Sequence, residues 1–298
     1  GRTDCVTILL PSLMENQIAL WGSQAAGIAN PVNHFLDTGH ITDIMNRVKS
    51  KVLITLAPGD TIGLQPKVAE LIKNVPSLTH VFLVRDTPDG SIDTQTFCHP
   101  GIQVRDFHQA IEKQPDDQLK HGQAIKGSDT AIYFHTGGTT GKPKIAVLTH
   151  SSIAFVAQVY ADYNHHHGPS AVLNPLPLFH VFGTITASLA VFIQGRCVIL
   201  MSPAGFRNSN VVKNWWFFVE KYQVAWFATV PTIISALLKN PPRNENIDCL
   251  KFINSGSAPL PVELKKTCAR QFNAEVVSGY GMTESSCLIA RCLNGYET

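Results

Sequence analysis

Apolar and polar positions along this chain form two kinds of segment: short runs rich in β-branched residues, and longer runs with helical spacing. The first pair is the run 6–10, which Pro11 ends, and the helical stretch 15–26, which Gly27 ends. This alternation continues to residue 85 and is typical of a parallel sheet with packed helices. It predicts strands at 6–10, 28–31, 51–57 and 79–85, and helices at 15–26, 43–50 and 65–74.

Residues 86–126 are polar, and we expect a connecting segment there, with a turn at 88–90 and a short helix at 107–113. Strands at 130–134 and 146–148 and a helix at 151–163 follow, and the polar stretch 164–169 then breaks the pattern. We therefore expect two α/β subdomains, 1–164 and 165–298. The second is predicted to have strands at 195–201, 225–230, 250–253 and 275–277, and helices at 215–222, 232–239 and 264–272.

The stretch from Ala171 to Gln194 is long and apolar, and His180 is its only titratable residue. Pro175 and Pro177 interrupt it, so it lacks the ~20 uninterrupted apolar residues that a membrane-spanning helix needs. We therefore expect a buried strand, a turn and a helix here, and no transmembrane segment.

The composition is that of a folded protein, with 44% hydrophobic and 15% charged residues. The 24 basic and 22 acidic residues leave a net charge of +2 without a basic block, which gives no support for nucleic-acid binding. Seven cysteines without a Cys-x-x-Cys pair indicate reduced thiols, and the first residues show no secretory pattern, so a cytoplasmic location is expected. The sequence leaves the oligomeric state open.

Three adjacent histidines, His165 to His167, could be taken for a metal site. Successive residues point in different directions on any regular element, so a solvated turn is the favoured interpretation.

Between two predicted strands lies the segment Thr136-Gly137-Gly138-Thr139-Thr140-Gly141-Lys142-Pro143-Lys144. Glycines let the backbone approach phosphate oxygens, successive N–H groups form an anion-binding concavity, and threonine hydroxyls and lysines add donors. The segment therefore predicts a polyphosphate site at a strand end, where open α/β sheets bind ligands. A flexible surface loop is the alternative from composition alone.

Two commoner phosphate-binding patterns do not match. A Walker loop needs Ser or Thr after its lysine, whereas Pro143 follows Lys142. The nearest approach to the dinucleotide-binding pattern, Gly279-Tyr-Gly-Met-Thr-Glu284, has Glu where the third glycine is required.

Two further glycine-rich segments, 253–260 and 278–285, each follow a predicted strand. In the second, Tyr280 between two glycines can lie flat on a nucleobase, while Thr283 and Glu284 offer a hydroxyl for phosphate and a carboxylate for Mg²⁺. Singly, each segment is more often a plain turn. With the first loop, they indicate a nucleotide site.

These segments resemble two signatures of the adenylate-forming superfamily, Thr-Ser-Gly-Thr-Thr-Gly-x-Pro-Lys-Gly at 136–145 and Tyr-Gly-x-Thr-Glu at 280–284. The superfamily includes acyl-CoA synthetases, luciferases and peptide-synthetase adenylation domains. Residues 178–183, Leu-Phe-His-Val-Phe-Gly, resemble the acyl-CoA synthetase segment at the carboxylate pocket, and 19–32 resemble an early helix and strand of the family. The resemblance implies the superfamily's N-terminal domain, two stacked α/β subdomains most like those of a fatty-acid CoA ligase, with the C-terminal domain absent.

The resemblance also implies a role for each matching residue. Thr136 to Lys144 would surround the β- and γ-phosphates, and Thr283 would contact the α-phosphate. Glu284 would hold Mg²⁺, and His180 would stand at the mouth of the acyl pocket, near the substrate carboxylate. Adenine would lie against Gly256, Ser257, Ala258, Pro259 and Tyr280, and the nucleotide segment also includes Gly279, Gly281 and Met282. Residues expected to act in the reaction are Lys144, His180, Thr283 and Glu284.

The implied reaction is attack of a carboxylate on the α-phosphorus of ATP, which gives acyl-AMP and pyrophosphate, followed by attack of a coenzyme A thiol, which releases AMP. Positioning and charge neutralisation would carry it without a protein nucleophile. The implied ligands are ATP or AMP, Mg²⁺, coenzyme A and a small carboxylic acid, fatty or otherwise. An acid is absent from 171–194, where amino-acid adenylation domains usually have aspartate, so a simple carboxylic acid is favoured.

The chain departs from the signature at two positions. Gly137 replaces the usual Ser, which removes one donor, a loss on the order of 1 kcal/mol. Ile145 replaces the closing Gly, and since a β-branched residue does not readily take a positive φ, we expect it in a strand.

Nothing beyond Glu284 resembles the family's Tyr-x-Thr-Gly-Asp segment, hinge or catalytic C-terminal lysine, so the expectation is a fragment with weak nucleotide binding and little or no turnover. The alternatives are adenylation without coenzyme A, or a non-catalytic nucleotide-binding regulatory or scaffold protein on the same fold.

Overall fold

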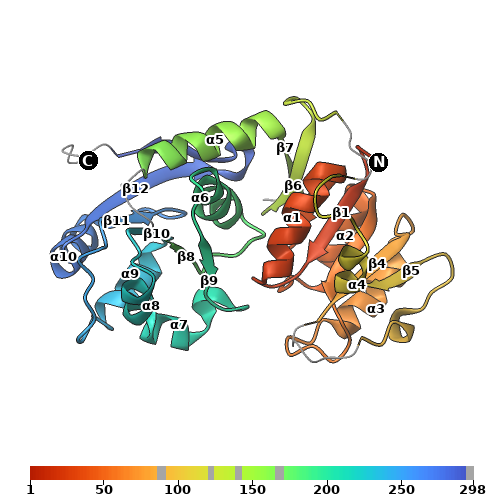
Figure 1. Ribbon diagram of the computed structural model, residues 1–298, viewed down its shortest axis with the longest axis horizontal. Coiled ribbons are helices and arrows are strands. Elements are labelled where there is room, and N and C mark those ends of the chain that lie inside the picture. Colours follow the sequence, from red (N-terminus) through yellow and green to blue (C-terminus); the bar gives the residue numbers. More distant parts are fainter. Residues whose placement is uncertain (86–91, 120–123, 138–142, 165–170, 293–298) are drawn as a thin grey trace. The chain divides into compact units, whose positions relative to one another are not determined.

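The computed structural model describes residues 1–85, 92–119, 124–137, 143–164 and 171–292. They belong to two compact units, Gly1–His150 and Ser151–Thr298 (Figure 1). Each unit has parallel β-sheet with helices, so the predicted α/β class is confirmed.

The first unit is built on a seven-stranded sheet. Its elements are β1 (Cys5–Leu9), α1 (Met14–Ala26), β2 (Ile28–Pro31), α2 (Thr38–Arg47), β3 (Ser50–Leu56), α3 (Gln65–Asn74), β4 (His80–Val84), η1 (Gln95–Phe97), β5 (Gln103–Asp106), α4 (Phe107–Glu112), β6 (Thr130–Thr136) and β7 (Lys144–Thr149). The strand order is β5-β4-β3-β1-β2-β6-β7. All neighbours are parallel except β6 and β7, which form an antiparallel hairpin.

Local chemistry sets the helix ends in this unit. The Asp37 carboxylate accepts the His40 N–H at 2.9 Å, so α2 begins before the predicted position 43. Helix α1 ends at Gly27, where an added Cβ would lie 2.4 Å from the Asp4 carbonyl oxygen, so only glycine fits. This tight contact lets β2 start at once beside β1.

The second unit contains a four-stranded sheet, β10-β11-β12-β13, and a two-stranded sheet, β8-β9. Its elements are α5 (His150–Tyr163), β8 (Val172–Asn174), the π-helix η2 (Phe182–Leu189), α6 (Ala190–Ile193), β9 (Val198–Leu200), η3 (Gly205–Arg207), α7 (Ser209–Lys213), α8 (Trp215–Lys221), β10 (Trp226–Thr229), α9 (Pro231–Leu238), β11 (Phe252–Ser255), α10 (Val262–Phe272), β12 (Glu275–Met282), η4 (Thr283–Ser285) and β13 (Cys287–Arg291). Strands β10, β11 and β12 are parallel, and β13 runs antiparallel to β12.

Aromatic residues form much of the core of the second unit. Trp215 and Phe227 are fully buried and meet edge to face, with ring centroids 4.9 Å apart. Trp216 packs on Phe272 of α10 at 4.4 Å. These contacts fix α8 and α10 against the sheet, whose strand β12 leads to the candidate site.

The division between the units differs from the predicted boundary after residue 164. It falls between His150 and Ser151, so nearly all of α5 belongs to the second unit. The reason is that α5 is tied to that unit: the Tyr160 ring meets Trp226 at 5.7 Å, and Asn254 Nδ2 donates to Asn164 Oδ1 at 2.9 Å.

One other expectation needs correction. The segment 86–126 contains strand β5 at the sheet edge, which its polar sequence Gln-Val-Arg-Asp conceals. The stretch 171–194 does form the predicted strand, turn and helix, although much of the helix is a π-helix. In the described part of the chain, no helix has the length and apolar character needed to cross a membrane.

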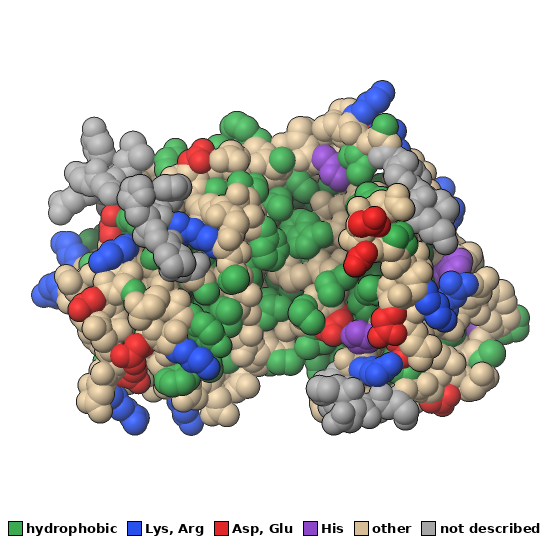
Figure 2. Space-filling model, in the orientation of Figure 1, with side chains coloured by type: hydrophobic (Ala, Val, Ile, Leu, Met, Phe, Trp, Pro, Cys, Tyr) green, Lys and Arg blue, Asp and Glu red, His purple; other side chains and the backbone are tan. Residues whose placement is uncertain are grey.

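Charged side chains of both signs are scattered over the face shown in Figure 2. All seven cysteines lie in described residues, and none is in a disulfide.

Candidate functional site

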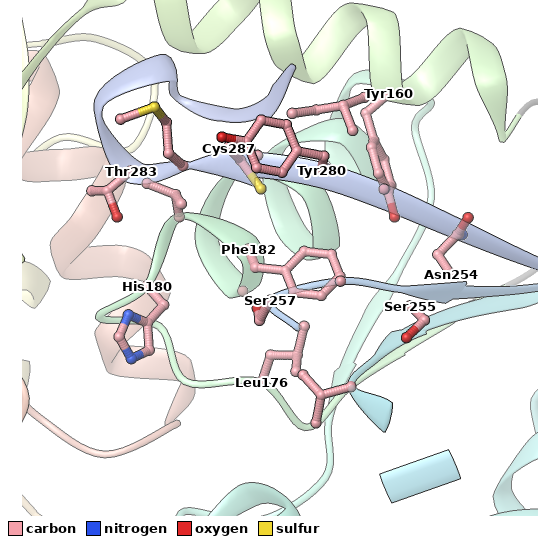
Figure 3. A pocket seen from close by; sticks show the side chains of 18 of the residues that line it. Tyr160, Leu176, His180, Phe182, Asn254, Ser255, Ser257, Tyr280, Thr283 and Cys287 are labelled. Carbon is pink, nitrogen blue, oxygen red and sulfur yellow. The ribbon is translucent and has the colours of Figure 1, made fainter. Parts of the chain in front are cut away.

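The second unit contains a cavity of about 410 Å³ (Figure 3). Its lining comes from Tyr160 on α5 and mainly from three separate stretches, within 176–183, 254–257 and 277–291. Three of the four segments that the sequence singles out, those around His180, at 253–260 and around Tyr280, thus meet at one pocket. His180 and Thr283 lie at one end of it in Figure 3, and Tyr160, Asn254 and Ser255 lie at the other.

Asn174 holds the segment that carries His180. Its buried Nδ2 donates to the Gly183 carbonyl oxygen and to Ser188 Oγ, each at 2.9 Å, and its Oδ1 accepts the Leu176 N–H at 3.1 Å. These bonds fix the turn that leads into the π-helix η2, a rare helix type that occurs frequently at functional sites.

His180 is exposed to solvent, and the protein around it desolvates the ring enough to lower the pKa of its imidazole. The lowered pKa favours the neutral form of the ring over the charged form. A neutral ring can donate one hydrogen bond to a carboxylate oxygen without forming an ion pair.

The predicted loop at 279–281 is in fact strand. Strand β12 runs on to Met282 because β13 pairs with it, with Gly279 opposite Arg291 and Gly281 opposite Leu288. Glycine-tyrosine-glycine is thus part of a hairpin, and Tyr280 presents an exposed ring, 65% accessible.

The glycines of both segments face protein groups. An added Cβ on Gly281 would lie 1.5 Å from the Cys287 carbonyl oxygen, and one on Gly279 would lie 3.3 Å from Leu288 Cδ1. On Gly256 it would meet the Phe182 ring at 3.2 Å. Glycine at these positions therefore allows close packing within the protein. The sequence interpretation assigned these glycines to ligand contact and did not include this packing role.

Thr283 and Glu284 follow in the short turn η4. The turn is anchored at Ser286, whose buried hydroxyl donates to Ser152 Oγ on α5 at 3.0 Å. Ser286 and Cys287 have φ of 61° and 104°, which costs backbone strain in non-glycine residues. The Glu284 carboxylate is exposed beside the pocket residue Thr283.

A second hollow of about 710 Å³ shares Ser257, Gly279, Tyr280, Gly281 and Arg291 with the first. It is also lined by Ala258 and Pro259, so all four residues of the predicted adenine segment, 256–259, line one hollow or the other.

The predicted phosphate segment lies in the first unit. Thr136 ends β6 and pairs with Lys144, which begins β7, so the segment joins the two strands of the hairpin. Gly137 is exposed, and no atom of the described residues lies within 4 Å of an added Cβ. Ile145 lies in β7, as predicted. Gly138, Thr139, Thr140, Gly141 and Lys142 lie outside the described residues, as do the three histidines.

Sequence reasoning missed several pocket residues. Tyr160 falls on the buried face of α5, where the helical pattern indicates core, and its hydroxyl is buried without a hydrogen-bond partner in the described residues. Cys287 and Arg291 follow the recognised signature, and nothing in their spacing marks them. Burial raises the pKa of the Cys287 thiol to about 12, so it is a neutral wall group. Among the described residues, no cluster of three metal-ligating side chains is found.

Comparison with known proteins gives consistent matches. The chain is 36% identical over 290 residues to a marinolic acid–CoA ligase of Pseudoalteromonas sp. (strain SANK 73390), covering 94% of this chain and 42% of that protein. It is 27% identical to the long-chain-fatty-acid–CoA ligase of Bacillus subtilis (strain 168), covering 96% and 52%. The chain spans about half the length of the curated relatives it matches.

Among solved structures, the anthranilate CoA ligase AuaEII in complex with anthranoyl-AMP superposes with a TM-score of 0.80 at 22% identity, covering 100% of this chain and 54% of that one. This likeness supports the fold. The model of the family "AMP-binding enzyme" matches residues 1–297, and the chain therefore belongs to the AMP-binding enzyme family.

Proposed function

We propose that the protein activates a carboxylic acid with ATP and transfers the acyl group to coenzyme A. A carboxylate oxygen attacks the α-phosphorus and pyrophosphate leaves. The coenzyme A thiol then attacks the acyl carbonyl, which gives a thioester and AMP. Family membership and the CoA-ligase names of the relatives support this proposal.

One observation carries the proposal: the pocket has Thr283 and His180 at one end and a largely apolar wall beyond them. A carboxylic acid fits such a shape with its polar group at the mouth and its tail inside. Neutral His180 would donate to the carboxylate, and Thr283 would donate to the α-phosphate. The two groups would hold the reacting atoms together, and positioning of this kind lowers the barrier without a protein nucleophile.

Glu284 suits Mg²⁺, because its carboxylate is exposed at the turn that carries Thr283 and Mg²⁺ prefers oxygen ligands. When bound, the ion would neutralise phosphate charge. Thr136, Gly137 and Lys144, with the loop between them, would bind the β- and γ-phosphates, and Tyr280 with 256–259 would bind adenine. The exposed Tyr280 ring and the hollow beside it leave room for a base.

The acid would be fatty or another simple acyl acid, because the pocket wall includes apolar groups such as Leu176, Phe182 and Leu288. We also propose a cytoplasmic location, which seven cysteines outside disulfides favour.

Exchange of labelled pyrophosphate into ATP by the full-length protein, with a panel of carboxylic acids, tests the proposal. Acid-dependent exchange is expected, and Glu284→Gln should reduce it by at least about a hundredfold, since electrostatic groups at such sites contribute on this scale. Glu263→Gln, an exposed charge on α10 outside the pocket, is the matched control and should leave exchange unchanged. Failure with every acid, in a protein that binds nucleotide, would favour the non-catalytic alternative.

A further inference from the structure

The inner end of the pocket holds donors that none of the described residues satisfies. The Tyr160 side chain is 3% exposed, and its hydroxyl has no hydrogen-bond partner among the described residues. Arg291 Nη1 is also buried and has no hydrogen-bond partner among the described residues. A buried donor without a partner costs about 1–3 kcal/mol, so two of them beside one cavity indicate a missing acceptor.

The two donors belong to one corner of the pocket. Arg291 stacks on the Tyr163 ring, with its guanidinium carbon 5.3 Å from the centroid, and Tyr160 lies one helical turn before Tyr163 on α5. Burial and the neighbouring Cys287 raise the pKa of Tyr160, whereas the Arg291 charge lowers it, so the guanidinium is close enough to act on the phenol.

This corner is far from the end that holds Thr283. Arg291 is at the end of β13 away from the η4 turn that carries Thr283, and the strand spans roughly 13 Å at about 3.3 Å per residue. In Figure 3 the Tyr160 hydroxyl likewise lies on the opposite side of Phe182 from Thr283 and His180. A tail anchored by its carboxylate at His180 would end near Tyr160 and Arg291.

We propose that the substrate acid carries a hydrogen-bond-accepting oxygen at the far end of its tail, which accepts from the Tyr160 hydroxyl and the Arg291 guanidinium. This inference rests on the proposed function and narrows its substrate class. A terminal hydroxyl and a terminal carboxylate share the required chemistry, whereas a plain hydrocarbon end would leave both donors unsatisfied. Because an unsubstituted fatty acid offers no acceptor to these two donors, the pocket should bind it less tightly than an oxygen-ended acid.

The test is calorimetric binding of three sulfamoyl acyl-adenylate analogues to the full-length protein, with octanoyl, ω-hydroxyoctanoyl and suberoyl tails. At least one oxygen-ended analogue should bind roughly tenfold or more tightly than the octanoyl one, as expected for a hydrogen bond from buried or charged donors. The preferred analogue identifies whether the acceptor is a hydroxyl or a carboxylate. Tyr160→Phe and Arg291→Met should each remove most of the preference, while Tyr222→Phe, which packs against the core and does not line the pocket, should keep it.

A second readout separates recognition from a structural role. Because the Tyr160 hydroxyl has no hydrogen-bond partner within the described parts of the chain, Tyr160→Phe should leave the melting temperature of the free protein unchanged or raised. Equal or tighter binding of the octanoyl analogue, or a preference that survives both variants, would overturn the inference while leaving adenylate binding intact. Failure of all three analogues to bind would overturn the proposed function as well.

Discussion

Gly281→Ala tests whether the Tyr-Gly-Met-Thr-Glu segment is held by hairpin packing. The added Cβ would lie 1.5 Å from the Cys287 carbonyl oxygen and 2.6 Å from its carbon, whereas such contacts are essentially never under 3.0 Å. Both obstacles are backbone, so no side chain can rotate away. The strands would have to separate by about 1.5 Å at the Gly281–Leu288 pair.

The magnitude follows from that separation. Overpacking of a rigid site costs about 1–3 kcal/mol, and the loss of a ladder hydrogen bond adds about 1 kcal/mol. We therefore expect Gly281→Ala to lower the free energy of unfolding of the second unit by about 2–4 kcal/mol.

Urea unfolding followed by tryptophan fluorescence measures this change. Three of the four tryptophans, Trp215, Trp216 and Trp226, lie in the second unit, so the signal reports mainly that unit. Gly137→Ala is the control, because none of the residues that the structure describes comes within 4 Å of its added Cβ, and it should leave the unfolding midpoint unchanged. A loss below about 0.5 kcal/mol for Gly281→Ala, the range of ordinary surface substitutions, would refute the packing argument.

Two further predictions concern charge and thiol chemistry. For Asp106, burial raises the carboxyl pKa, but hydrogen bonds from Arg85 and the Gln109 N–H outweigh it, and the net pKa lies below 3.8. The stabilisation by the charged carboxylate is therefore present above pH 3.8 and is lost as the pH falls through the lowered pKa. Asp106→Asn should lower the free energy of unfolding at neutral pH by about 1–3 kcal/mol. In urea titrations below about pH 4, the stability of this variant should depend less on pH than that of the unmodified protein. An equal loss of unfolding free energy at neutral pH and below about pH 4 would contradict this. Cys287 should react with iodoacetamide at about pH 8 far more slowly than exposed Cys98, because its pKa is raised to about 12 by burial; mass spectrometry of the labelled peptides checks the order, and comparable rates would contradict it.

The sequence predicts the first unit well because its central strands are nearly continuous apolar runs. Strands β1, β3 and β4 follow that pattern, and their buried positions leave little choice of structure. Strand β5 is missed because its residues 103–106 are mostly polar. It lies at the sheet edge, where most of its side chains are not buried and so need not be apolar.

The pocket is predicted only in part, for a physical reason. His180, Tyr280 and Thr283 lie in recognisable segments, and the structure brings those segments to one cavity. Tyr160 and Arg291 could not be predicted as pocket residues. Helical spacing indicates that Tyr160 is buried, but long-range packing determines which strand it contacts. Arg291 reaches the cavity only because β13 reverses against β12, a pairing that the Gly-Tyr-Gly sequence, typical of a turn, hides.

The same reversal bears on how variants in this segment are to be interpreted. Because Gly281 has no side chain, Cys287 can pack directly against β12. This contact requires the chain to turn through Ser286, which has a positive φ, and it fixes the turn that carries Thr283 and Glu284. A glycine variant that loses activity would therefore displace these two side chains without having touched the nucleotide. If Gly281→Ala lowers both stability and adenylate binding, whereas Glu284→Gln lowers pyrophosphate exchange at unchanged stability, the glycine acts through the hairpin and the carboxylate acts at the ligand. A Gly281→Ala protein of normal stability that no longer binds adenylate would reverse that assignment.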